Sequence, residues 1–256
     1  MAAVTKINLE EHTYNETLSI QVSLDGFSFY AQDKNTGGYD EIVARTEENA
    51  DSPEKILRKI EQVFEDHAGI LKTFNTVDVV YRNELFTIVP SALFDPERLT
   101  DYLKYNTKIL STDFIVFDEI KPFELIVIYI PFANINNFFF DRFGSFSYHH
   151  HMTVFIEKVL DNASNSQKQA VVNLDQGNFE IVAHEGKKML LANSFTYENA
   201  EDFLYHILFC YEQLNFDPNR DTLVINGQLD KNGALYQLTQ TYIRHIKLVE
   251  KSLLSA

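Results

Sequence analysis

The chain has 256 residues, of which 45% are apolar, and its 22 Lys and Arg against 37 Asp and Glu give a formal net charge of −15. This is the composition of a globular protein, and the negative charge excludes a nucleic-acid binder that works by neutralising phosphates. One cysteine, Cys210, allows no internal disulfide and no cysteine-rich zinc site, which favours a reducing compartment. The first residues contain no apolar signal core, and no apolar run is long enough to cross a bilayer. We therefore expect a cytoplasmic protein that does not insert into membranes.

The first part of the chain predicts three strands followed by a helix. Apolar residues alternate along the strands, and Asp25-Gly26 forms a hairpin turn between the first two. Ser52-Pro53 is typical of a helix start, because Ser caps the first turn and Pro fits the first helical position. The expected strands are Thr17–Leu24, Phe27–Ala31 and Glu41–Arg45, with a turn at 35–38 between the last two.

The middle of the chain alternates between strands and helices. The expected strands are Val77–Tyr81, Leu85–Val89, Phe114–Phe117, Leu125–Ile130 and Phe146–His149, and the expected helices are Asp95–Asn106, Ile135–Phe143 and Met152–Leu160. Polar and small residues from Asp161 to Gln167 then predict a linker.

The last part of the chain begins with the same pattern of three strands and a helix. The expected strands are Ala170–Leu174, Phe179–Ala183, Met189–Ala192 and Thr222–Ile225, and the expected helices are Glu198–Leu214 and Ala234–Val249. The second helix is inferred from an apolar stripe of Leu235, Leu238, Tyr242, Ile246 and Val249.

The two β-β-β-α patterns superimpose without a gap when the sequence is shifted by 150 residues. Leu24, Asp25 and Phe29 then meet Leu174, Asp175 and Phe179. This self-similarity predicts an internal duplication, with agreement by pattern alone as the alternative.

The order of elements in the second half carries a family resemblance. The run Glu124–Pro131, the aromatic helix, the strand Ser145–His149 and the hairpin Val171–Gly177 resemble bacterial actin-like proteins of pilus assembly and cell division. The whole chain, opening with the hairpin Ser19–Phe29, resembles an uncharacterised bacterial family assigned an actin-like ATPase fold.

This resemblance implies an α/β protein built from duplicated RNase H-like lobes in an actin-like ATPase arrangement. The first lobe is expected at 1–166, with a small inserted β-α-β-β subdomain at about 85–120, and the second lobe at 167–256. Mixed sheets flanked by helices are expected in both lobes.

The resemblance also implies the position of a nucleotide site. In this fold, carboxylates at Asp25 and Asp175 orient magnesium-bound water, and the turns that contain Gly26 and Gly177 wrap the phosphates. The turn Asn226-Gly227, after a late apolar strand, corresponds to the adenosine contact. Only glycine lets backbone approach a nucleotide closely, because it has no Cβ.

All three turns depart from the family pattern. Bulky Phe27 follows the first turn, no Gly-x-x-Thr sequence follows Asp175, and one glycine replaces the pair expected at Gly227. We therefore expect no cofactor, and a catalytically degenerate scaffold that binds a protein partner still to be identified. The alternative is a divergent ATPase or phosphotransferase that binds ATP and Mg²⁺ through Asp25 and Asp175.

Other motifs are interpreted structurally. The side chains of His149-His150-His151 fan out from adjacent positions, so we expect no metal site there. An RNase H-type nuclease using Asp25, Glu48 and Asp175 is disfavoured by the negative charge. Cys210 lies on an apolar helical stripe and is expected to be a packed thiol. The aromatic run from Phe138 to Phe146 is interpreted as core, with a partner-binding role as the alternative if part of it is exposed.

Overall fold

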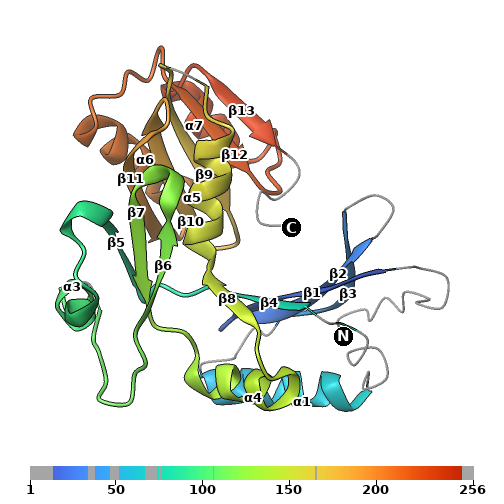
Figure 1. Ribbon diagram of the computed structural model, residues 1–256. Helices are drawn as coiled ribbons and strands as arrows, with labels where there is room; N and C mark the ends of the chain where they lie inside the picture. Colours follow the sequence, from blue (N-terminus) through green and yellow to red (C-terminus); the bar gives the residue numbers. More distant parts are fainter. Residues whose placement is uncertain are drawn as a thin grey trace. The chain divides into compact units, whose positions relative to one another are not determined.

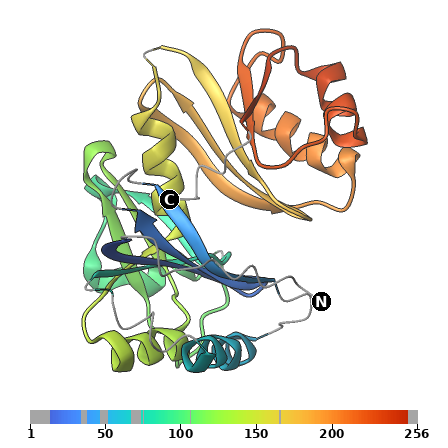
Figure 2. The same cartoon turned by 90° about the vertical axis from the view of Figure 1, so that its right-hand side faces the viewer.

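The computed structural model describes residues 14–33, 38–46, 52–66, 74, 76–105, 107–164 and 166–249, and it is shown in two views in Figures 1 and 2. The chain forms two compact units, which divide between Thr153 and Val154, inside helix α5 (His151–Asp161). The lobe boundary predicted at 166/167 lies further along the chain, just before the first strand of the second large sheet. Within the described residues, no helix is both long and apolar enough to cross a membrane. Of the predicted turn at 35–38, only Gly38 lies inside the described residues.

The first unit contains a five-stranded mixed sheet in the order β3-β2-β1-β4-β8. Strands β1, β2 and β3 are antiparallel neighbours, whereas β4 and β8 run parallel to β1. The strands are β1 (Tyr14–Ser23), β2 (Gly26–Asp33), β3 (Tyr39–Thr46), β4 (Thr76–Tyr81) and β8 (Ser147–His150). Helices α1 (Pro53–Asp66) and α4 (Ala133–Phe143) lie side by side next to this sheet in both views.

The core of this sheet follows from the alternation of β1 and β2, which place apolar side chains on one face. Leu18, Ile20 and Val22 are buried there, and α1 buries Ile56, Ile60, Val63 and Phe64 at the 3–4 residue spacing of an amphipathic helix. Phe64 is the central ring, 5.9 Å from Phe29 and 5.2, 6.2 and 5.6 Å from Phe138, Phe139 and Phe143 of α4. Most of the aromatic run is therefore core, as the sequence predicts, although Phe140 is exposed.

A smaller subdomain lies between β4 and α4 and contains a sheet in the order β5-β7-β6. It contains strands β5 (Phe86–Pro90), β6 (Val116–Ile120) and β7 (Leu125–Tyr129), helix α3 (Leu99–Leu103), and 3₁₀ turns η1 (Ser91–Leu93), η2 (Pro96–Arg98) and η3 (Lys121–Phe123).

Two predictions in this subdomain were displaced. The helix expected at Asp95–Asn106 is short, because its first turn forms η2, where the Asp95 carboxylate accepts a hydrogen bond from the Glu97 N–H at 3.0 Å. The strand expected at Phe114–Phe117 is instead β6, because pairing with β7 sets its position through Phe117↔Ile128 and Asp118↔Val127.

The second unit repeats the topology of the first sheet in the order β11-β10-β9-β12-β13. Its strands are β9 (Lys168–Leu174), β10 (Asn178–Glu185), β11 (Lys188–Thr196), β12 (Thr222–Asn226) and β13 (Ile246–Val249). Helices α6 (Ala200–Gln213) and α7 (Ala234–Tyr242) lie on one side of this sheet, and the part of α5 that belongs to this unit lies on the other (Figure 2). The fold class predicted from sequence, mixed sheets flanked by helices in two lobes, is confirmed.

The residues that occupy equivalent positions in the two opening hairpins are separated by a different number of residues from the shift of 150 used in the sequence alignment. Val22 pairs with Phe27 in the first hairpin, and Leu174 pairs with Phe179 in the second. The equivalent residues are thus 152 apart, not 150. A shift by two leaves every side chain on its original face, so alternation alone does not detect the difference.

The closing helix predicted at Ala234–Val249 was wrong in its second half. Helix α7 ends at Tyr242, Ile243 is extended, and β13 pairs in parallel with β12 through Leu223↔Ile246. The strand forms because β12 offers a free edge: the Leu223 N–H donates to the His245 carbonyl at 2.9 Å. Backbone pairing thus overrides a helical apolar period.

This corrected end of the chain predicts opposite results for neighbouring substitutions. Ile243→Ala empties a fully buried position and is expected to lower the free energy of unfolding by about 2–5 kcal/mol. Tyr242→Ala affects a side chain that is 55% exposed and is expected to cost less than about 1 kcal/mol. Urea unfolding followed by circular dichroism measures both, and a larger loss for Tyr242→Ala would support the continuous helix.

Candidate functional site

The predicted site residues of the second unit meet at one end of its sheet. Strands β9 and β12 are parallel, with Asn173 opposite Asn226, so their carboxyl ends lie together. A Cβ on Gly227 would lie 2.5 Å from the carbonyl oxygen of Leu174, the residue before Asp175. Gly227 also has a φ of +121°, so only glycine fits this close approach. The fold therefore gathers Asp175, Asn226 and Gly227 at the sheet end where α/β proteins bind ligands.

The turn after β9 makes several hydrogen bonds with its own chain. The Asp175 N–H donates to the Asn178 carbonyl at 3.0 Å, and the Asp175 carboxylate accepts from the Gln176 N–H at 2.8 Å. Tyr197 closes the turn from outside, because its hydroxyl donates to the Asp175 carbonyl at 2.8 Å and its N–H donates to the Gly177 carbonyl at 2.9 Å. Gly177 has a φ of +74°, as this turn requires. Two of the turn's N–H groups are thus already paired within the protein.

Asn226 is the most unusual residue at this end of the sheet. Its side chain is fully buried, yet no described residue hydrogen-bonds its amide oxygen or nitrogen. The neighbouring Asn173 amide, in contrast, donates to the buried Glu180 carboxylate at 2.8 Å. An unpaired buried amide costs about 1–3 kcal/mol, so such groups are normally paired with water or a ligand. Asn226 is therefore the feature of this site that favours a bound molecule.

The corresponding turn of the first unit is different. Strand pairing places Ser23, not Asp25, at the position that Asp175 holds in the second unit. The Ser23 hydroxyl donates to the Gly26 carbonyl at 3.1 Å and accepts from the Asp25 N–H at 3.2 Å, which closes a two-residue turn. Asp25 is exposed in that turn, and Phe27 is part of β2 and buried in the core, 5.7 Å from Phe29.

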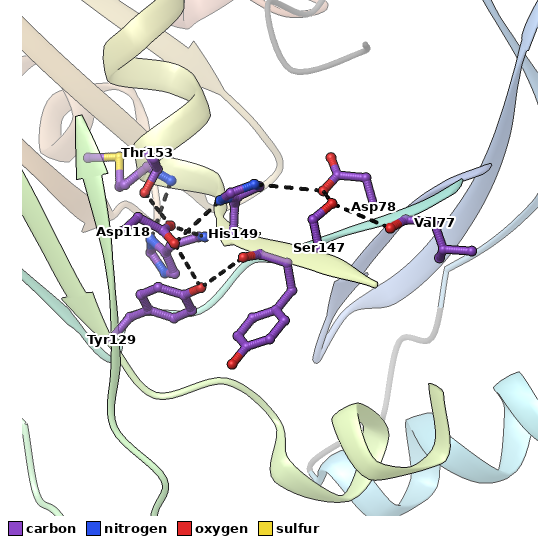
Figure 3. Close-up of polar contacts among 10 residues, drawn as sticks. Val77, Asp78, Asp118, Tyr129, Ser147, His149 and Thr153 are labelled. Carbon is purple, nitrogen blue, oxygen red and sulfur yellow. Dashed lines mark hydrogen bonds and ion pairs between the residues drawn. The ribbon is translucent and has the colours of Figure 1, made fainter. Parts of the chain in front are cut away.

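A buried carboxylate that the sequence analysis missed lies at the junction of the inserted subdomain and β8 (Figure 3). Asp118 of β6 accepts hydrogen bonds from the His150 N–H at 2.8 Å, the Thr153 hydroxyl at 2.7 Å and the Tyr129 hydroxyl at 3.2 Å. The Nδ1 atom of His149 lies 3.4 Å from the same carboxylate. The carboxylate thus lies at the start of α5, next to the residue that precedes the helix and to the Thr153 side chain of its first turn, where the helix dipole favours negative charge.

The cluster around Asp118 has a structural role. Burial raises the pKa of Tyr129 far above its ordinary value, with the Asp118 charge adding to the shift, so the phenol stays protonated and donates. The signal available in the sequence was the alternation Val116, Asp118, Ile120, in which a carboxylate lies between apolar neighbours. The predicted strand ended at Phe117 and left Asp118 outside it.

The three adjacent histidines have separate surroundings. His149 is half-buried between Asp118 and Asp78, whereas His150 is fully buried, with its ring centroid 4.8 Å from that of Phe86. The Met152 N–H donates to Nδ1 of His150, so Nε2 carries the proton and donates to the Asn83 carbonyl at 3.2 Å. Among the described residues, no group of three or more His, Cys, Asp or Glu side chains could hold a metal ion.

Cys210 is packed in the core of the second unit, as predicted. It lies on the buried face of α6 with Phe203 and Ile207, and is only 3% exposed. Burial raises its pKa to about 11, so the thiolate required for nucleophilic chemistry is scarce at neutral pH.

Comparisons with known proteins support the fold. A family described as "Protein of unknown function (DUF3822)" matches residues 6–246, and no curated protein matches. The structure of a Bacteroides thetaiotaomicron protein with an actin-like ATPase fold and unknown function covers 100% of this chain and 99% of that chain, at 21% identity and a TM-score of 0.84. The PilM–PilN type IV pilus biogenesis complex covers 93% of this chain and 89% of that chain, at 9% identity and a TM-score of 0.61. The resemblance stated from the sequence is confirmed at the level of family and fold.

The buried histidines predict how stability depends on pH. Burial lowers the pKa of His150 well below its ordinary value, with His151 adding to the shift, and burial also lowers that of His184. The unfolded chain binds these protons near pH 6.5, so below that pH it holds more protons than the folded protein. Unfolding free energy is expected to fall between about pH 6.5 and 5, by up to about 1.4 kcal/mol per pH unit for each histidine.

Urea unfolding at several pH values measures this slope. The matched control is His245→Gln, which changes an exposed histidine and is expected to keep the slope. His150→Gln is expected to reduce it. Stability that stayed constant from pH 7 to 5 would contradict the assignment of buried neutral histidines.

Proposed function

This chain belongs to the DUF3822 family and has an actin-like ATPase fold, and we propose that it is a non-hydrolysing member of this fold that works by binding another protein. The observation that carries the proposal is the first turn. Ser23 takes the strand-end position that Asp175 holds in the second unit, so a carboxylate is present at this position in only one of the two hairpins. Orienting a magnesium-bound water from both lobes requires both carboxylates.

The closed turns give a second reason. Phosphate binding uses backbone N–H groups that point to the ligand, as in a nest or a phosphate loop. The Asp25 N–H is paired with Ser23, and the Asp175 and Gln176 N–H groups are paired within their own turn. Phosphate would have to replace these bonds to use these N–H groups.

A protein partner is supported by the neighbouring fold and by the surface. The pilus neighbour is itself part of a complex of PilM with PilN. The described surface also exposes large apolar side chains that a partner could cover. They are Leu93, Tyr105, Leu110, Phe114, Phe117, Phe140, Tyr205, Phe209 and Tyr242.

The second candidate function is nucleotide binding at the end of β9 and β12, and the specific observation that favours it is Asn226. Its buried, unpaired amide offers one acceptor and two donor hydrogens, which can pair with the complementary groups of a purine edge or a ribose. This alternative uses ATP with Mg²⁺ bound near Asp175.

A thermal shift with ATP and Mg²⁺ tests the main proposal. At millimolar nucleotide the melting temperature is expected to equal that in buffer, and no phosphate release is expected. A ligand at about 100 times its dissociation constant would add about 2.7 kcal/mol, or roughly 5–10 °C for a chain of this size. Steady release of phosphate that Asp175→Asn abolishes, without loss of folding, would overturn the proposal.

Asn226→Leu separates the two candidates. If the amide is unpaired in the working protein, replacing it with an apolar side chain of similar size is expected to leave stability unchanged or raise it by about 1 kcal/mol. If a nucleotide pairs with it, this variant loses the thermal shift while Asp25→Asn keeps it. Melting temperatures of both variants with and without ATP and Mg²⁺ give the answer.

A further inference from the structure

A continuous series of aromatic rings leads from the core of the second unit to its surface. Phe195 of β11 stacks on His206 of α6 with centroids 4.6 Å apart, and His206 lies 5.4 Å from Tyr205. Tyr205 in turn stacks on Phe209 at 6.3 Å, with 64% and 46% of these two side chains exposed. Both rings are fixed on a helix, so binding a partner would cost them little conformational entropy.

These exposed rings and two acidic residues form one surface stripe, the α6 stripe. Glu201, Tyr205, Phe209 and Glu212 are all exposed and fall on one side of α6, because their spacing of four, four and three residues returns to the same helical face. From Met189 to Phe216 the chain has four acidic residues, Glu198, Glu201, Asp202 and Glu212, and no Lys or Arg. The surface therefore combines aromatic faces with carboxylates, which is the chemistry that recognises arginine.

Strand β11 forms one edge of the second large sheet, and its Phe195 stacks on His206 of α6. It pairs with β10 on one side, and no strand in the described part of the chain pairs with its other side. Edge strands are normally protected by charge, proline or a bulge that twists the edge away. The one charged residue of β11, Lys188, and the bulge in the pairing with β10 both lie at the start of the strand, and from Met189 to Thr196 there is no charge and no proline.

We propose that β11 and the α6 stripe together form a docking surface for an extended, arginine-containing peptide of a partner protein. The peptide adds a strand to the free edge of β11 and lays an arginine guanidinium on Tyr205 and Phe209, between Glu201 and Glu212. This inference rests on the protein-binding role proposed above and assigns the surface that performs it.

The two halves of the surface supply different parts of recognition. Backbone pairing with β11 gives affinity with little dependence on sequence, as in other strand-addition complexes. The stripe gives specificity, because a planar guanidinium stacks on aromatic faces and forms paired hydrogen bonds with carboxylates. The −15 net charge of the chain also draws a basic segment to it.

Fluorescence anisotropy with a labelled peptide tests the surface. The probe has about seven residues, the length of a common strand, in which valine and arginine alternate. One control probe replaces each arginine with glutamate, and a second replaces each valine with proline, which keeps the charge but removes every second backbone donor and disfavours strand pairing. We expect binding of the first probe only, weakened by salt.

Variants locate the binding site. The double variant Tyr205→Ala with Phe209→Ala is expected to weaken binding of the valine–arginine probe by about tenfold or more. The matched double variant Tyr105→Ala with Phe140→Ala, which removes exposed rings from the first unit, is expected to leave it unchanged. Charge reversal by Glu201→Lys with Glu212→Lys is expected to shift preference toward the glutamate probe. All these positions are exposed, and circular dichroism checks that each variant folds.

Three outcomes would overturn the proposal. The first is equal binding of the proline–arginine probe, and the second is unchanged binding of the valine–arginine probe in the Tyr205 and Phe209 double variant. The third is a dimer in sedimentation analysis that pairs through β11 and excludes the probe. Its failure is distinguishable from failure of the proposed function. A peptide that does not bind, in a protein that also does not hydrolyse ATP, removes this surface only. Steady ATP hydrolysis removes the non-hydrolysing role whatever the peptide does.

Discussion

The inserted subdomain, the last strand of the first sheet and the start of α5 all depend on one buried carboxylate. Asp118 reaches from β6 to the backbone of His150 and the hydroxyl of Thr153, while Tyr129 of the adjacent strand closes the same cluster. An isolated carboxylate in this position would be very costly. Three hydrogen bonds and the start of a helix offset that cost, so the geometry of the junction is fixed by the need to satisfy one charge.

Alternation along strands explains both what the sequence predicts and where it fails. The core faces of β1, β2, β9 and β10 follow directly from a period of two, and the order of elements was enough to identify the actin-like fold. A period of two is blind to a shift by two, however, so the alignment matched Asp25 with Asp175 while the hairpins match Ser23 with it. The last strand, β13, was missed because its residues also fit a helical stripe, and only the free edge of β12 decides between them.

Some residues of the site could also be predicted from the sequence, and others could not. Asp175, Asn226 and Gly227 follow two strands whose parallel pairing brings them together, and sequence order was sufficient to group them. Asp118 could not be found in this way, because its partners are remote in the sequence and the signal is a single acidic residue in a short strand. The α6 stripe could not be predicted from the sequence either, because the exposure of its rings depends on which face of the helix packs on the sheet.

Cys210, the single cysteine of the chain, can report local opening of the second unit. Cys210 is almost inaccessible, and burial raises its pKa to about 11, so little thiolate is present at pH 7. A thiol reagent therefore reacts at a rate set by how often α6 leaves the sheet rather than by the reagent's access to the closed state. Local stability can thus be measured at Cys210 without introducing a new residue, and no second cysteine contributes to the signal.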